Sequence, residues 1–277
     1  MLKLGNIDYA NCFPPHAGIL LRKIPFPFEL VDGVPSRLNR LLHDGDIAVS
    51  PSSSIEYAKY PERYDILQDL SITSKSRVMS ILLECDRPIQ ELGDRTVALT
   101  SASATSNVLL RILLEIRYGI LPKYVTYEQG VEDSTVKADA VLTIGDLAIK
   151  KTMTSKAAYR YDLGTLWNEF TGLPFVFALW QVNREHAGHK ELERLYHILR
   201  ESKEYGLSHL KELASVAADR FRLPSEVLLE YWRLFSYDFG EIEHKAVSAF
   251  YGYAAQLGAV PAVPELRITS FSRNEKD

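Results

Sequence analysis

The stretch Phe175-Val176-Phe177-Ala178-Leu179-Trp180 is an unbroken apolar run that begins directly after Gly172-Leu173-Pro174. A short run of this kind, bounded by turn residues and rich in aromatic and β-branched side chains, is typical of a buried strand. Strand and helix patterns alternate before it, whereas the chain after Glu185 predicts helices only. We therefore expect this run to cross from one part of the fold back into another.

A second segment of the same kind, Val78-Met79-Ser80-Ile81-Leu82-Leu83, lies near the middle of the alternating region and leads to Pro88. The two crossings, at roughly residues 76–90 and 173–183, join two α/β units. The chain would leave one lobe, build the other and return to finish the first with helices. The predicted fold class is therefore α/β with two lobes and a ligand cleft between them. The expected division is 1–85 plus 177–277 for lobe one and 86–176 for lobe two.

Hydrophobic periodicity and turn residues predict the individual elements. In the first unit we expect strands at Leu2–Ile7, Phe28–Val31 and Ile47–Val49, which would pair in parallel, and helices at Pro15–Leu21, Pro35–His43 and Ser52–Tyr60. In the second unit we expect strands at Thr96–Leu99, Tyr124–Tyr127 and Ala138–Ile144, and helices at Ser106–Tyr118, Asp146–Lys150 and Leu163–Phe170. The closing helices are expected at Glu191–Tyr205, Leu210–Arg220, Ser225–Phe235 and Glu241–Leu257, and a frayed polar tail at Arg267–Asp277.

Composition narrows the function classes. The 277 residues are 46% hydrophobic and 25% charged, with a net charge of −4, which is ordinary for a globular protein and unlike a nucleic-acid-binding one. The longest apolar stretch, Leu173–Val182, is broken by Pro174 and too short to span a membrane, and the N-terminus does not resemble a secretory signal. The two cysteines, Cys12 and Cys85, have no zinc-site spacing. We expect a cytoplasmic protein without metal, cofactor, nucleic-acid or membrane partner, and leave its oligomeric state open.

The hydroxyl-rich stretch Thr100-Ser101-Ala102-Ser103-Ala104-Thr105-Ser106-Asn107 lies between a strand and a helix. The first backbone N–H groups of a helix have no intrahelical acceptor, and the helix dipole is positive at that end. The stretch lacks the Gly-rich, Lys-bearing pattern that cradles nucleotide phosphates, which favours a carboxylate or similar small anion. The alternative is an ordinary serine cap. Thr105 and Ser106 lie nearest the expected helix start.

Four further polar features would converge on the same cleft. They are Asn11 after the first strand, Ser50 and Ser52 before the helix at Ser52–Tyr60, Ser80 in the first crossing, and Gly145-Asp146 at the end of a strand. Each also has a purely structural interpretation, as a turn residue, a helix cap or a buried serine bonded to backbone. Asp146 could instead bind a substrate hydroxyl or handle a proton. His16 lies close to Asn11 and remains an alternative base.

Taken in order, these segments resemble one known family. The segments are Asp8-Tyr9-Ala10-Asn11-Cys12-Phe13-Pro14, Gly45–Pro51 followed by Ile55-Glu56-Tyr57, Val78-Met79-Ser80, Thr100–Ser106, Ile144-Gly145-Asp146 and Asp162–Trp180. Within them, Thr171-Gly172-Leu173-Pro174-Phe175-Val176-Phe177-Ala178 is the most specific block. The family is chorismate dehydratase of the futalosine route to menaquinone, and the similarity spans roughly residues 1–255. Two positions depart from the family pattern: Ala10, where relatives often have Leu, and Thr143, where they usually have an aliphatic residue.

The resemblance implies a periplasmic-binding-protein type II fold and a hydro-lyase that converts chorismate to 3-[(1-carboxyvinyl)oxy]benzoate and water, the first step of that route. We expect Asn11 and Asp146 to be catalytic and no cofactor to be needed. The substrate-binding residues expected with them are Ser50, Ser52, Ser80, Ser103, Thr105, Ser106 and Gly145. Two alternatives stay open: the dihydroxynaphthoate synthase of the same pathway, and a non-catalytic protein that binds a small carboxylate.

The motifs also suggest how the reaction would proceed. Chorismate is a dianion, yet these segments contain no cluster of Arg or Lys, so neutral dipoles would bind its carboxylates. The ring loses the C3 proton and the C4 hydroxyl. The substrate's own enolpyruvyl carboxylate would take the proton while Asn11 holds the substrate in place, with Asp146 as the alternative proton handler. Whether Cys12 touches substrate or only packs stays open.

Overall fold

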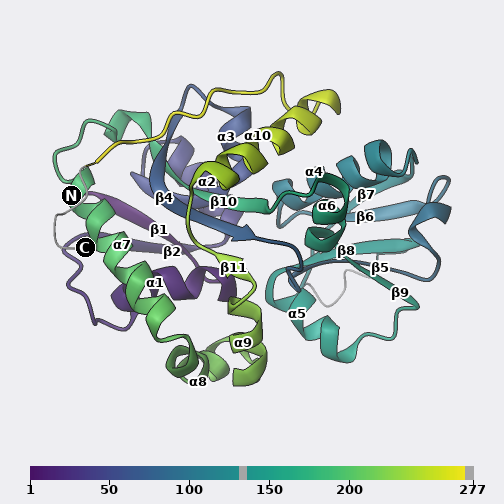
Figure 1. The fold of residues 1–277 in the computed structure, drawn as a ribbon, viewed down its shortest axis with the longest axis horizontal. Helices are drawn as coiled ribbons and strands as arrows, with labels where there is room; N and C mark the ends of the chain where they lie inside the picture. The colour runs from purple at the N-terminus through teal and green to yellow at the C-terminus, as the bar shows by residue number, and fades with distance from the viewer. Residues whose placement is uncertain (131–135, 272–277) are drawn as a thin grey trace.

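The computed structural model describes residues 1–130 and 136–271 and arranges them as two α/β lobes lying side by side (Figure 1). The first lobe contains a sheet of six strands, in pairing order β11 (Phe235–Ser236), β4 (Tyr64–Ser74), β10 (Phe175–Asn183), β3 (Val49–Ser53), β1 (Lys3–Ile7) and β2 (Glu29–Gly33). The second contains a sheet of five, in pairing order β7 (Lys123–Tyr127), β6 (Thr96–Thr100), β8 (Ala140–Ile144), β5 (Ile81–Cys85) and β9 (Tyr159–Asp162). The two-lobed α/β class predicted from the sequence is confirmed.

Helices cover both sheets. Those of the first lobe are α1 (Phe13–Leu20), α2 (Pro35–His43), α3 (Ser54–Lys59), α7 (Leu192–Ser208), α8 (Leu210–Phe221), α9 (Ser225–Trp232) and α10 (Glu241–Gln256). Those of the second are α4 (Ala104–Arg111), which continues as the π-helix η3 (Ile112–Arg117), α5 (Gly145–Thr154) and α6 (Leu163–Thr171). Short 3₁₀ turns are η1 (Ala10–Cys12), η2 (Ile89–Glu91) and η4 (Arg184–His186). In the described part of the chain, no helix has the length and apolar character needed to cross a bilayer.

Strand β10 explains the apolar run that led to the fold prediction. All nine of its residues are buried, and it pairs antiparallel with β3 on one side and β4 on the other. The parallel pairing predicted for the first three strands is confirmed, since β1 pairs in parallel with β2 and β3. The strand that returns from the second lobe, β10, enters the same sheet in the opposite direction.

Strand β4 was not predicted from the sequence. It is eleven residues long and lies between β11 and β10, but its pairing with β10 has two register shifts, and Asp69 has a φ of 59°. These irregularities break the alternation of apolar and polar side chains that identifies a strand.

Strand β5 shows where the chain passes between the lobes. It pairs with β8 and β9 in the second sheet, so a boundary at residue 85 would separate it from its partners. The apolar run at 78–83 predicted a strand but carried no information about which sheet the strand would join. We propose boundaries that follow the sheets, between β4 and β5 and between α6 and β10.

The first crossing segment is held rigidly beside the second lobe. The carboxylate of Asp162 accepts hydrogen bonds from the backbone N–H groups of Val78, at 3.0 and 3.1 Å, and Met79, at 2.7 Å. The backbone of Gly164 also lies so close that a Cβ there would stand 2.2 Å from the carbonyl oxygen of Ser76. These contacts fix the segment that carries Ser80 into the space between the lobes.

An aromatic cluster joins the lobes at the second crossing. The ring of Trp167 on α6 packs edge-on against Phe175 of β10, at 5.3 Å between centroids, and against Phe250 and Tyr253 of α10. Trp167 is fully buried, so this contact makes the hinge region part of the core.

The C-terminal tail is docked rather than frayed as far as Phe271. The carbonyl oxygen of Arg267 accepts a hydrogen bond from the N–H of Ile66, and Thr269 donates to the carbonyl of Ile66. The side chain of Gln68 bonds both the N–H and the C=O of Phe271. The polar composition of the tail did not predict these contacts, because backbone groups make most of them. Residues 272–277 lie outside the described part of the chain.

Candidate active site between the lobes

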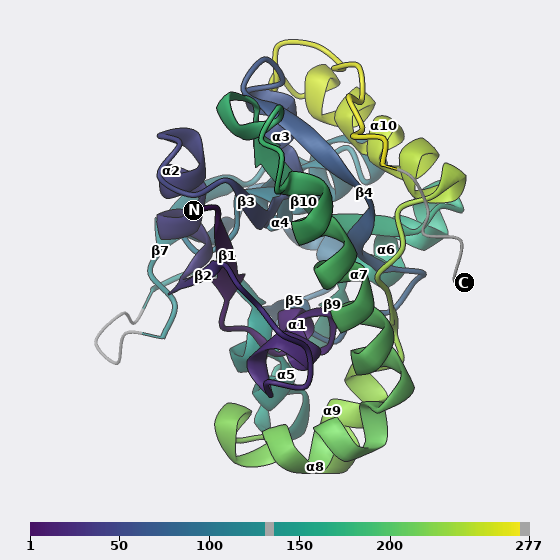
Figure 2. The ribbon, with the colours of Figure 1, turned by 90° about the vertical axis from the view of Figure 1, so that its left-hand side faces the viewer.

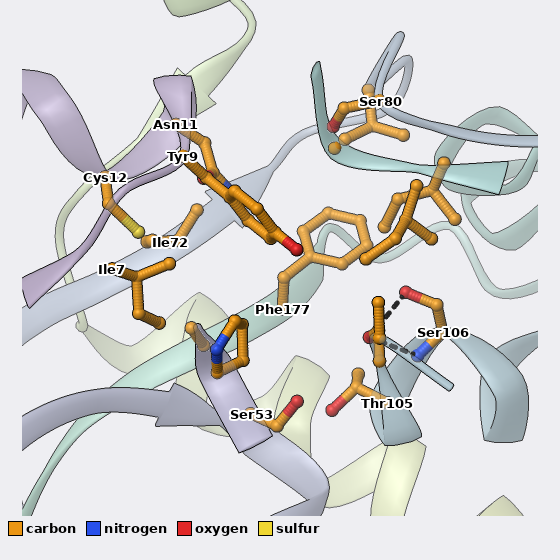
Figure 3. A pocket seen from close by; sticks show the side chains of 18 of the residues that line it. Ile7, Tyr9, Asn11, Cys12, Ser53, Ile72, Ser80, Thr105, Ser106 and Phe177 are labelled. Atoms are coloured by element: carbon orange, nitrogen blue, oxygen red, sulfur yellow. Dashed lines mark hydrogen bonds between the residues drawn. The ribbon is translucent and has the colours of Figure 1, made fainter. Parts of the chain in front are cut away.

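A pocket opens between the two lobes and encloses about 620 Å³ of empty space, part of it open to solvent. Residues from both lobes line it, and the close-up in Figure 3 shows their side chains facing one another across it. The labelled ones are Ile7, Tyr9, Asn11, Cys12, Ser53, Ile72, Ser80, Thr105, Ser106 and Phe177. Within residues 1–130 and 136–271, none of those that line the pocket is Lys, Arg, His, Asp or Glu. An anion here would depend on neutral hydrogen-bond donors.

Asn11 lies in η1, whose backbone is held by large side chains from the end of the first lobe. The indole Nε1 of Trp232 donates to the carbonyl of Ala10 at 2.7 Å, and the hydroxyl of Tyr237 donates to the carbonyl of Asn11 at 2.9 Å. The side-chain oxygen of Asn11, Oδ1, is buried and has no hydrogen-bond partner among the residues that the structure describes. Since a buried acceptor without a partner costs about 1–3 kcal/mol, this atom points to a ligand that donates a hydrogen bond.

The N-terminus of α4 faces the pocket with the hydroxyls expected from the sequence. Ser103 is the helix cap, and its Oγ accepts from the N–H of Ser106 at 3.2 Å. Thr105 and Ser106 line the pocket in the first helical turn, which contains no acidic residue. The hydroxyl of Thr105 also accepts a hydrogen bond from the N–H of Ile55 in α3, at 3.2 Å, and so joins the two lobes. In this loop, Ser103 therefore acts as the helix cap, whereas Thr105 and Ser106 are placed to bind an anion.

Ser80 and Gly145 line the pocket next to each other. The N–H of Gly145 donates to the carbonyl of Ser80 at 2.8 Å. Gly145 has a φ of 66°, a conformation that favours glycine, and the ring of Tyr9 lies against it from the opposite lobe. The Ser80 side chain is almost fully buried, so any ligand contact with its hydroxyl would be shielded from solvent.

Asp146 does not line the pocket. It lies in the first turn of α5, and its Oδ1 accepts a hydrogen bond from the N–H of Ala10 in the other lobe, at 3.1 Å. Burial raises the pKa of Asp146 from 3.8 to about 6. A carboxylate in this position occupies the positive end of α5, whereas α4 has no such residue. An incoming anion is therefore better accommodated at α4.

Ser50 and Ser52 lie outside the pocket. The structure continues β3 through these serines, where we expected a loop, and side chains alternate along a strand. Ser50 packs against Gly5 and donates to the carbonyl of Pro51, while Ser52 donates to Oδ1 of Asn39 at 2.7 Å. Ser53, on the opposite face, lines the pocket instead.

Several lining residues were not identified from the sequence, among them Tyr9, Ser53, Phe177 and Phe235. Tyr9 lies in the same loop as Asn11, two residues before it, and this position could have identified it as a lining residue. Phe177 was hidden inside an apolar strand. Burial raises the pKa of Tyr9 and of Cys12 above their usual ranges, so both pocket groups stay protonated at neutral pH.

His16 belongs to the core. Its Nδ1 bonds Oδ1 of Asn6 at 2.8 Å, and its Nε2 accepts from the indole N–H of Trp180 at 3.3 Å. Asn6 in turn donates to Asp32 at 2.7 Å. The ring is fully buried, which lowers its pKa from 6.5 to about 4. A neutral imidazole with both nitrogens engaged is a structural group and is not available as a base.

His16 should make the fold sensitive to acid. The unfolded chain takes up a proton near pH 6.5 and the folded one only near pH 4, so the stability that depends on neutral His16 is complete above pH 6.5 and is lost toward pH 4. The loss should approach roughly 3 kcal/mol. Chemical denaturation at pH 7 and pH 4.5 should show a shallower pH dependence for His16→Gln than for the wild type. Equal pH dependence of the two proteins would contradict this.

Comparison with known proteins gives a consistent result. A family model described as menaquinone biosynthesis matches residues 2–256. The chain is 35% identical over 262 residues to the chorismate dehydratase of Thermus thermophilus, covering 89% of this chain and 93% of that protein. It is 34% identical to the chorismate dehydratase of Campylobacter jejuni, covering 68% and 70%. It is only 27% identical to the 1,4-dihydroxy-6-naphtoate synthase of Thermus thermophilus, covering 87% and 88%.

Solved structures share the fold. A protein of Archaeoglobus fulgidus superposes with a TM-score of 0.77 at 19% identity, covering 94% of this chain and 98% of that one. The periplasmic aliphatic sulphonate binding protein of Escherichia coli superposes with a TM-score of 0.65 at 15% identity, covering 100% and 94%. The predicted periplasmic-binding-protein-like fold is confirmed.

Proposed function

Because the chain belongs to the menaquinone-biosynthesis family, we propose that it is a hydro-lyase that dehydrates chorismate to 3-[(1-carboxyvinyl)oxy]benzoate. The two chorismate dehydratases, at 34% and 35% identity, support the reaction. The single structural observation that carries the proposal is the buried, unpartnered Oδ1 of Asn11 in a pocket lined by neutral groups. A cytoplasmic location stays a prediction.

One substrate carboxylate would bind at the N-terminus of α4. The hydroxyls of Thr105 and Ser106 and the positive end of the α4 dipole would supply the attraction there, while Ser103 holds the turn in shape by accepting the N–H of Ser106. Ser80 and the backbone at Gly145 would contact the substrate from the crossing segment and α5. Ser50 and Ser52 would support β3 from the side that faces away from the pocket.

Asn11 would bind the C4 hydroxyl, since its Oδ1 needs a donor and a substrate hydroxyl supplies one. Its amide N–H is then the nearest donor for the oxygen as the C4–O bond breaks. Because the C3 proton is vinylogous to the ring carboxylate, hydrogen bonds to that carboxylate would stabilise the negative charge that develops as the proton leaves. The pocket thus favours loss of the proton and of the hydroxyl together.

The base would come from the substrate. Among the described residues that line the pocket, the titratable side chains are Tyr9 and Cys12, and burial keeps both protonated. The enolpyruvyl carboxylate of chorismate would therefore remove the C3 proton, and that proton would leave with the C4 hydroxide as water. The protein's part is to hold the two groups in a reactive geometry.

Thr105 offers a test of substrate binding. In Thr105→Val the side chain keeps its shape but loses the hydroxyl that faces the pocket and accepts from Ile55. We expect KM for chorismate to rise about threefold to tenfold, as for one lost hydrogen bond. Thr105→Ser keeps the hydroxyl and should stay close to the wild type. An unchanged KM in Thr105→Val would remove Thr105 from the binding site.

Incubation with chorismate separates this proposal from its main alternative, a non-catalytic binding protein of the same fold. An enzyme should convert chorismate to the aromatic enol ether, detected as a loss of one water by mass spectrometry. Saturable binding without any change in ligand mass would support the binding protein and reject the hydro-lyase.

A further inference from the structure

Asp146 and Asn11 are connected through Ala10, the residue that precedes Asn11 in the chain. Asp146 reaches across from the second lobe, and its Oδ1 accepts the N–H of Ala10 at 3.1 Å. Asn11, which lines the pocket, follows directly in the chain, and its buried Oδ1 has no partner among the described residues. The contact therefore acts on the backbone that aims the Asn11 amide, while the carboxylate itself stays outside the pocket.

The other two contacts on this turn come from the first lobe. Trp232 bonds the carbonyl of Ala10 and Tyr237 bonds the carbonyl of Asn11, and both belong to the same lobe as η1. Asp146 adds a hydrogen bond from the facing lobe. When the lobes separate, the first two bonds can persist, but the bond to Asp146 must break.

We propose that Asp146 is a positioning residue that couples lobe closure to the orientation of Asn11 by accepting the Ala10 N–H across the cleft. This inference rests on the proposed function, because it assigns Asn11 to the reaction. A positioning role differs from a role in proton transfer in one respect. The contact with Ala10 needs an acceptor oxygen at position 146 but no titratable group. An amide at position 146 can supply that oxygen.

The surroundings of Asp146 add a pH dependence to closure. Burial raises its pKa to about 6, although the hydrogen bond from the Ala10 N–H and the charge of Lys150 on α5 both lower it; Asp8 adds a smaller upward shift. Tyr9, Cys12 and Tyr231 of α9 also lie close to it. An open cleft would return Asp146 toward its ordinary pKa of 3.8. Protons therefore bind the closed form better, and closure should become easier as pH falls from 7 to 5. Asp146→Asn should lack this dependence.

Two substitutions at position 146 test the proposal. Asp146→Ala removes the acceptor, and we expect kcat on chorismate to fall by about tenfold to a hundredfold, the scale of a misplaced catalytic group. Asp146→Asn keeps an acceptor oxygen, and kcat should stay within about threefold of the wild type. A loss in Asp146→Asn as large as that in Asp146→Ala would overturn the proposal in favour of proton transfer. An unchanged kcat in Asp146→Ala would overturn it outright.

Asp8→Asn is the matched control. It removes a nearby negative charge and an exposed ion pair with Arg220, at 2.8 Å, without touching the Ala10 N–H. Its kcat should stay within about twofold of the wild type, since exposed ion pairs contribute little. A loss equal to that of Asp146→Ala would mean that the local charge, and not the hydrogen bond, orients Asn11.

Hydrogen exchange at the Ala10 amide tests the contact without any turnover. The amide should be protected in the wild type and in Asp146→Asn and should exchange faster in Asp146→Ala, with melting curves checking the fold of each. Equal protection in all three would overturn the proposal. If the wild type does not convert chorismate, the proposed reaction fails by itself, while the exchange rates still decide whether Asp146 holds the Ala10 peptide.

Discussion

Asn11→Ala is expected to lower kcat on chorismate by about 10²–10³-fold, the scale observed when one polar group aimed at a reacting oxygen is removed. The reason is geometric, because the described lining of the pocket contains no charged side chain that could replace the amide. The fold should be unaffected, since Trp232 and Tyr237 bond only the backbone of η1. Steady-state kinetics together with a thermal melt measure both effects.

Ser52→Ala is the control for this experiment. Ser52 was a predicted binding residue, but its hydroxyl bonds Asn39 outside the pocket. Its loss should cost about 1 kcal/mol of stability and leave kcat unchanged. If Ser52→Ala lost as much activity as Asn11→Ala, or if Asn11→Ala kept full activity, the assignment of Asn11 would be wrong.

Gly206→Ala is expected to produce the largest loss of stability. Helices α1 and α7 run side by side (Figure 2), and a Cβ at Gly206 would stand 1.9 Å from the carbonyl oxygen of Pro14. Because that neighbour is backbone, one helix must move. The free energy of unfolding should fall by about 2–3 kcal/mol, as in overpacked cores. Pro14 lies three residues after Asn11, so activity should fall as well.

Gly252→Ala is the matched control, a glycine-to-alanine change inside another helix. Gly252 lies in α10, and a Cβ there would have no neighbour within 4 Å. The substitution should raise the free energy of unfolding by about 0.5–1 kcal/mol through helix propensity alone. Urea denaturation of both variants measures the difference, and a Gly206→Ala protein as stable as Gly252→Ala would show that the helices tolerate the added atom.

Local patterns predicted the parts of this fold that depend on local physics. The helix at Pro35–His43 was placed at its observed bounds, and the apolar run at 175–180 correctly predicted a buried crossing strand. Local patterns contain no information about which distant segments pair. The sequence did not indicate that β5 joins the second sheet, that β4 is bulged, or that the tail docks on β4.

The candidate site was predictable at the level of loops rather than individual residues. Asn11, Ser80, Ser103, Thr105, Ser106 and Gly145 line one pocket, as the motifs suggested. Ser50 and Ser52 were predicted to bind substrate, but neither lines the pocket, because a strand, and not a loop, carries them and their side chains lie on the opposite face from Ser53. Asp146 was noted for its carboxylate, but its hydrogen bond to Ala10 could not be inferred, because it joins residues that are 136 positions apart.

The most direct test of the account is proton NMR of purified wild-type protein mixed with chorismate, with the Asn11→Ala protein in parallel. The account predicts that the wild type replaces the ring C3 and C4 proton signals with those of a meta-substituted aromatic ring, while both enolpyruvyl methylene protons remain. The Asn11→Ala protein should do so at least about 10²-fold more slowly. An unchanged chorismate spectrum in the presence of folded wild-type protein would contradict the account.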